Sequence, residues 1–85
     1  MERTVQPVEL RRVFRENIVR RRKELALTQA ALAIRLGVAQ PWVAQIESGV
    51  RTPAIDTIAR FANALQTTPD ALLTPEIFSE VALTA

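Results

Sequence analysis

Apolar residues recur every three or four positions along most of the chain, and no stretch alternates apolar and polar residues long enough to predict a strand. That spacing matches the period of an α-helix, about 3.6 residues. The pattern therefore predicts an all-α protein. The 85 residues fall below the usual domain size of ~100–150 residues, so we expect one domain.

Glycine, proline and capping residues divide the chain into five predicted helices. Thr28 is a favoured N-cap, and Gly37 stands where a left-handed residue ends a helix. Thr68, followed by proline, marks the start of the last helix. The predicted helices span residues 8–25, 29–36, 40–48, 55–65 and 69–73. A short N-terminal arm (1–7) precedes the domain (8–74), and a C-terminal extension (75–85) contains apolar residues that suit a further helical turn or two.

Apolar residues also predict the packing of these helices. We expect the second and third predicted helices to pack through Ile34, Leu36, Val43 and Ile46. The buried stripe of the fourth predicted helix is expected to contain Ile55, Ile58, Ala59, Ala62 and Leu65.

The composition argues against an enzyme. The chain contains neither Cys nor His, which excludes disulfides, thiolate nucleophiles and the commonest general base. The acids of the second half are spread over helix starts, where they complement helix dipoles rather than form a metal site. We expect no cofactor, no metal and no small-molecule ligand. No apolar run approaches the ~20 residues of a membrane span, and the N-terminus does not resemble a signal peptide, so a cytoplasmic location is expected.

The net charge of +2 conceals an asymmetry. Residues 1–51 carry ten basic and five acidic side chains, a charge of +5, whereas residues 52–85 carry one basic and four acidic side chains, a charge of −3. A basic half suggests a polyanionic partner. The alternative is an arginine-rich helix face that is merely solvated, and charge alone does not separate the two interpretations.

Residues 29–46 form the most informative segment, predicted to be helix, tight turn, helix. Ala33 is small enough for the closest approach of two steeply crossed helices, and Gly37 permits the positive φ of the turn. The outward face of the second helix of this pair consists of Gln40, Pro41, Trp42, Ala44 and Gln45.

At these residues the chain resembles the Cro-type phage-repressor, or XRE, family of helix-turn-helix regulators. The resemblance covers roughly residues 18–74. It implies a five-helix lambda-repressor-like domain that binds double-stranded DNA with its third helix in the major groove. The matching residues are Leu27-Thr28-Gln29, Leu32-Ala33, Leu36-Gly37-Val38, Val43, Gln45-Ile46-Glu47-Ser48-Gly49, Thr52-Pro53, Ile58-Ala59 and Ala64-Leu65.

The resemblance also implies roles for individual residues. Arg22 and Glu47 are expected to form a structural ion pair between the first and third helices. An alternative for Trp42 is that it folds back onto Arg35 or a neighbouring helix. Thr28 and Gln29 cap their helix whether or not they also contact a phosphate. The implied base-reading residues are Gln40, Pro41, Trp42 and Gln45, and the implied phosphate contacts are Thr28, Gln29, Arg51 and Arg21.

The sequence departs from the family pattern at two turns, where Ala26 and Gln66 replace residues that are often glycine. Near-palindromic operators favour a homodimer. The apolar residues of the C-terminal extension either form the dimer contact or fold back onto the fourth and fifth helices. The leading functional hypothesis is a repressor or autoregulator of transcription. The alternative is an antitoxin or phage-type control protein whose termini bind another protein.

Overall fold

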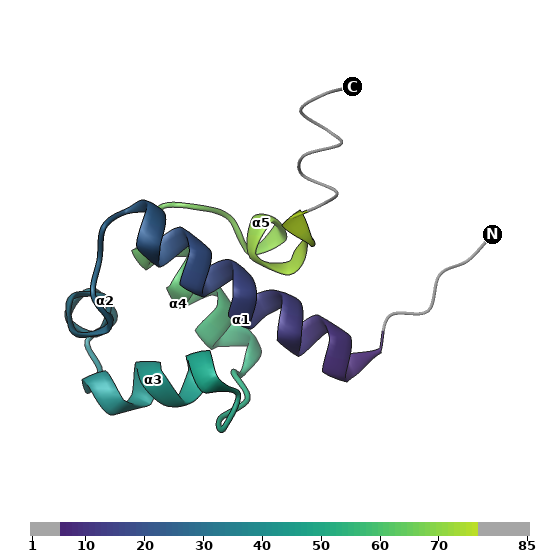
Figure 1. Cartoon of the computed structure of the whole chain (residues 1–85), viewed down its shortest axis with the longest axis horizontal. Helices are drawn as coiled ribbons and strands as arrows, with labels where there is room; N and C mark the ends of the chain where they lie inside the picture. The colour runs from purple at the N-terminus through teal and green to yellow at the C-terminus, as the bar shows by residue number, and fades with distance from the viewer. Residues whose placement is uncertain (1–5, 77–85) are drawn as a thin grey trace.

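The computed structural model describes residues 6–76, which form five α-helices and contain no strand. The helices are α1 (Pro7–Glu24), α2 (Gln29–Leu36), α3 (Gln40–Ser48), α4 (Ile55–Ala64) and α5 (Pro69–Leu73). The predicted all-α class and the order of its five helices are confirmed (Figure 1). The arm up to residue 5 and the apolar extension from residue 77, including its two proposed roles, lie outside the described residues.

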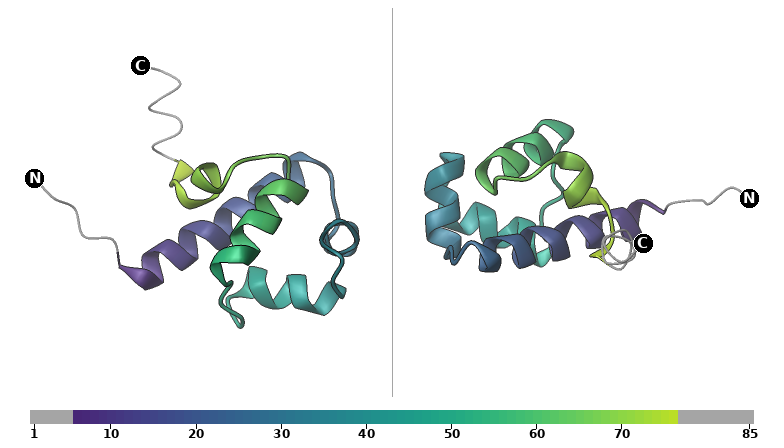
Figure 2. Two further views of the ribbon diagram at one scale, coloured as in Figure 1. Left: turned by 180° about the vertical axis from the view of Figure 1, so that it is seen from behind. Right: turned by 90° about the horizontal axis from the view of Figure 1, so that it is seen from above.

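The longest helix, α1, runs through the middle of the molecule. The short helices α3 and α5 lie on opposite sides of it, and α4 crosses behind it in Figure 1 and in front of it in the reverse view of Figure 2. α2 packs against α3 and α4. None of the helices in the described part of the chain is both long enough and apolar enough to span a membrane.

Every helix contributes to one apolar core. Phe61 of α4 lies at its centre, edge-to-face with Phe14 (ring centroids 5.6 Å apart) and stacked on Trp42 (5.8 Å). Asn17 is the one buried polar side chain among the described residues, and its amide donates to the carbonyl oxygens of Leu72 (2.8 Å) and Thr74 (2.9 Å). These bonds fasten α5 to α1 without leaving a buried polar group unsatisfied.

The helix ends follow the sequence signals. Thr28 Oγ1 accepts a hydrogen bond from the Ala31 amide, and Thr68 Oγ1 accepts one from the Ala71 amide. Gly37 and Gly49 end α2 and α3 with φ of +72° and +86°. Because glycine has no Cβ, these left-handed conformations carry no steric penalty.

Three packing predictions are wrong. Ile34 is 81% exposed, Ile55 is 83% exposed, and Ala59 is also exposed. The buried face of α2 carries Leu32 and Leu36, and Ile34, about 200° from each at ~100° per residue, points the opposite way. Ile55 is the first residue of α4 and Ala59 also faces solvent, whereas the buried residues of this helix are Phe61 and Ala62.

The turns at Ala26 and Gln66 keep a glycine-like geometry without glycine, with φ of +57° and +56°. A left-handed residue with a Cβ costs roughly 1–2 kcal/mol. We therefore expect Ala26→Gly and Gln66→Gly each to raise the free energy of unfolding by about 1 kcal/mol, since the steric relief exceeds the extra chain entropy of glycine. Urea unfolding measures the change. Ala59→Gly, at an exposed helical position, is the matched control and should destabilise by about 1 kcal/mol. Destabilisation at all three positions would contradict this explanation of the turns.

Candidate nucleic-acid interface

The turn between α2 and α3 fixes the direction of α3. The Gly37 amide donates to the Ile34 carbonyl and the Val38 amide to the Ala33 carbonyl, which closes the end of α2. Ala33 is buried, as its small size predicts. Figure 1 looks along α2 while α3 lies across the view, so the two helices cross steeply.

One side of α3 is anchored and the other is open. Val43 and Ile46 are fully buried in the core. Gln40 and Pro41 are exposed and Gln45 is half-buried. These three predicted readers therefore lie outside the core on a helix whose opposite side is firmly packed.

Trp42 departs from the expectation of an exposed reader. It is half-buried, and its indole ring stacks on Phe61 at an interplanar angle of 17°. Trp42 therefore packs on a neighbouring helix, α4, which is the alternative position predicted for it. The large apolar area of an indole ring explains the preference for the core edge over water.

Arg22 and Glu47 join α1 to α3 by a two-bond ion pair. Arg22 Nε lies 2.8 Å from Glu47 Oε2, and Arg22 Nη2 lies 3.1 Å from Oε1. The side chains are only 12% and 6% exposed. Arg22 Nη1 also donates to the Leu27 carbonyl oxygen (2.9 Å), which ties the α1–α2 loop to the pair.

Gln29 extends this ion pair toward the surface. Its amide nitrogen donates to Glu47 Oε1 (2.9 Å), and its amide oxygen accepts from Gln40 Nε2 (2.8 Å). Arg22, Glu47, Gln29 and Gln40 thus form one chain of hydrogen bonds from α1 to the exposed start of α3. Sequence reasoning missed this chain, because residues separated by 11 and 18 positions give no local signal of contact.

The predicted phosphate contacts fall in two places. Arg51, exposed in the loop after α3, donates from Nε to Gln45 Oε1 (3.1 Å), so it lies beside a predicted base reader. Arg21 lies on the α5 side of α1, where its guanidinium donates to the carbonyl oxygens of Leu65 (2.9 Å) and Gln66 (3.2 Å). It satisfies carbonyls left free at the end of α4, a structural task that separates it from Thr28, Gln29 and Arg51.

Two helices joined by a tight glycine turn, the second with a buried and an open polar side, define a helix-turn-helix domain. A family model described as a helix-turn-helix domain matches residues 9–74. The chain therefore belongs to the helix-turn-helix transcriptional regulators, in the Cro/C1-type group.

Relatives in sequence and in structure agree with this family. The chain is 32% identical over 68 residues to an uncharacterized helix-turn-helix transcriptional regulator, y4dJ, of Sinorhizobium fredii, covering 80% of this chain and 88% of that one. It matches the crystal structure of the P22 c2 repressor with a synthetic operator at 36% identity and a TM-score of 0.65, over 72% and 92% of the two chains. A hypothetical transcription factor from Neisseria, NHTF, shares the fold over 100% of this chain and 96% of its own, with a TM-score of 0.85 at 24% identity.

Proposed function

We propose that this protein is a sequence-specific regulator of transcription, a repressor or autoregulator, that places α3 in the major groove of double-stranded DNA. The observation that carries the proposal is the two-sided character of α3. Val43 and Ile46 hold the helix against the core, while Gln40, Pro41 and Gln45 lie on its open side. A helix held on one side and polar on the other fits a groove wide enough to admit it.

Glutamine suits base recognition because its amide donates and accepts at once. A bidentate glutamine pairs with N6 and N7 of adenine in the major groove. The amide oxygen of Gln45 accepts a hydrogen bond from Arg51, and the amide nitrogen of Gln40 donates one to Gln29, so both side chains are oriented before DNA binds. Such orientation reduces the entropy lost on binding.

Three residues are proposed to hold the DNA backbone. Thr28 and Gln29 stand at the start of α2, where free amides favour an anion, and Arg51 lies beyond the other end of α3. One domain of this size offers few contacts for tight specific binding, so the proposal includes a homodimer on a two-fold symmetric site. The operator in the similar P22 c2 repressor structure supports DNA as the partner.

A salt titration tests the backbone contacts. Arg51→Ala is expected to weaken binding to selected and random duplexes alike and to reduce the slope of log K against log salt by about one unit, because one phosphate contact is lost. Fluorescence anisotropy at several salt concentrations gives the slope. Arg35→Ala removes the same charge on the far side of α2, where Arg35 donates to the Ala64 carbonyl, and should leave the slope unchanged. Equal slopes for wild type and Arg51→Ala would remove Arg51 from the interface.

A further inference from the structure

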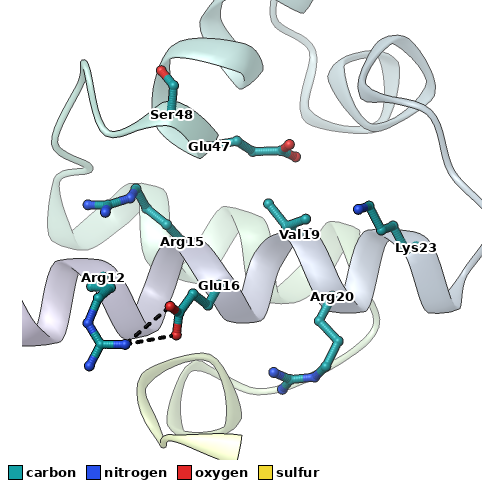
Figure 3. A pocket seen from close by; sticks show the side chains of 8 residues that line it. All are labelled: Arg12, Arg15, Glu16, Val19, Arg20, Lys23, Glu47 and Ser48. Carbon is teal, nitrogen blue, oxygen red and sulfur yellow. Dashed lines mark hydrogen bonds and ion pairs between the residues drawn. The ribbon is translucent and has the colours of Figure 1, made fainter.

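A groove of about 650 Å³ lies between α1 and the C-terminal half of α3. Figure 3 shows Arg15, Val19 and Lys23 rising from α1 toward α3, where Glu47 faces them, whereas Arg20 points away. These three α1 residues are four apart, so they form one row along the helix. The groove is lined by Arg12, Arg15, Glu16, Val19, Arg20, Lys23, Glu47 and Ser48.

The groove carries positive charge that the protein itself does not neutralise. Arg12 pairs with Glu16 and Arg20 pairs with Glu76, both at the surface. Neither Arg15 nor Lys23 has an ion-pair partner within residues 6–76. The carboxylate that faces them from α3, Glu47, is already paired with Arg22.

The groove also connects the two places proposed to hold phosphates. At one end Glu47 accepts a hydrogen bond from Gln29, the proposed contact at the start of α2. At the other end the Arg15 guanidinium packs on Gly49, about 3.1 Å from the position that a Cβ would take there, and Arg51 follows two residues later. Lys23 and Arg15 line the groove between these two ends, so a DNA backbone that spanned them would lie against both side chains.

We propose that this groove binds the phosphate backbone of the same DNA whose bases α3 reads, with Arg15 and Lys23 as phosphate contacts. The inference rests on the proposed function and extends the interface from the helix-turn-helix onto α1. Its contacts are purely electrostatic, so they add affinity and salt dependence without sequence preference. The competing interpretation is a solvated basic face that never meets DNA.

The double variant Arg15→Gln/Lys23→Gln tests the groove on a duplex selected by the wild-type protein. Loss of two phosphate contacts reduces the salt slope by about two units, so the affinity deficit of the variant should shrink about tenfold between 50 and 200 mM salt. The preferred sequence should not change. Arg35→Gln/Arg60→Gln, which removes two charges from the α2–α4 surface outside the groove, is the control and should keep the wild-type slope. Circular dichroism verifies that both variants are folded.

Neutral methylphosphonates at single positions of the duplex locate the contact. We expect methylphosphonates at particular positions to weaken DNA binding by the wild-type protein but not by the groove variant, because the variant has already lost the contacts to those phosphates. A groove variant with the wild-type slope and the wild-type methylphosphonate profile would overturn the inference while leaving sequence-specific binding intact. A wild-type protein that selects no sequence would instead refute the proposed function.

Discussion

Phe61→Ala is expected to lower the free energy of unfolding by about 3–5 kcal/mol, as for large aromatic residues removed from a packed core. Phe61 is fully buried and touches an aromatic ring on each side, Phe14 edge-to-face and Trp42 stacked. A domain of this size has a total stability of roughly 4–13 kcal/mol at ~0.05–0.15 kcal/mol per residue, so the substitution removes a large share of it. The substitution also removes the stacking contact between Trp42 of α3 and Phe61 of α4.

Trp42 provides the measurement, since it is the only tryptophan in the chain and lies at this contact. Urea unfolding followed by its fluorescence and by circular dichroism should show coincident transitions for the wild type and a lower midpoint for Phe61→Ala. Ile55→Ala on the same helix is the control, and at an exposed site it should change stability by less than about 0.5 kcal/mol. A loss below 1 kcal/mol for Phe61→Ala would contradict the central position given to this ring.

Glu47→Ala is expected to lower the free energy of unfolding by up to about 3 kcal/mol, because it leaves a mostly buried guanidinium, 12% exposed, without its ion-pair partner. The carboxylate accepts three hydrogen bonds, two from Arg22 and one from Gln29. For a domain of this size, each 1 kcal/mol corresponds to roughly 4–8 °C in Tm, so thermal unfolding shows the effect clearly. Gln29 and Gln40 lose their common anchor, and DNA affinity should fall even under conditions in which the variant stays folded.

The double variant Arg22→Met/Glu47→Leu separates the uncompensated charge from the loss of packing. Replacing a buried ion pair by apolar side chains is often close to neutral, so we expect this variant to be markedly more stable than Glu47→Ala. It should still bind DNA weakly, because Gln29 no longer has an acceptor to orient it. A double variant as unstable as Glu47→Ala would show that the unpaired Arg22 charge is not the cause.

The helix boundaries and turns were predictable because their signals are local. Threonine caps, prolines in first turns and glycines at helix ends each act within a few residues, and α2, α3 and α5 begin and end where those signals stand. The left-handed geometry also persists at Ala26 and Gln66 although glycine is absent. Backbone hydrogen bonds from Leu27 to the Arg22 carbonyl and from Thr67 to the Ala62 carbonyl accompany these two turns.

Contacts between helices were less predictable, because periodicity identifies an apolar stripe without saying which residues on it meet the core. Ile34 illustrates this limit, since its residue type suits a core and its position on α2 does not. The side chains of Trp42 and Arg21 are long enough that each could reach either of two different positions. The structure places Trp42 on Phe61 and Arg21 at the end of α4, neither of which is encoded by local spacing.

Selection of bound sequences from a random DNA pool, performed in parallel with the wild-type protein and Gln45→Ala, tests the role of α3 most directly. The wild type should enrich a two-fold symmetric sequence. Gln45→Ala should enrich the same sequence except at one base pair in each half, where a lost bidentate contact worth about 1–3 kcal/mol relaxes the preference. No enrichment by the wild type, or an unchanged preference at every position with Gln45→Ala, would contradict the assignment of α3 as the reading helix.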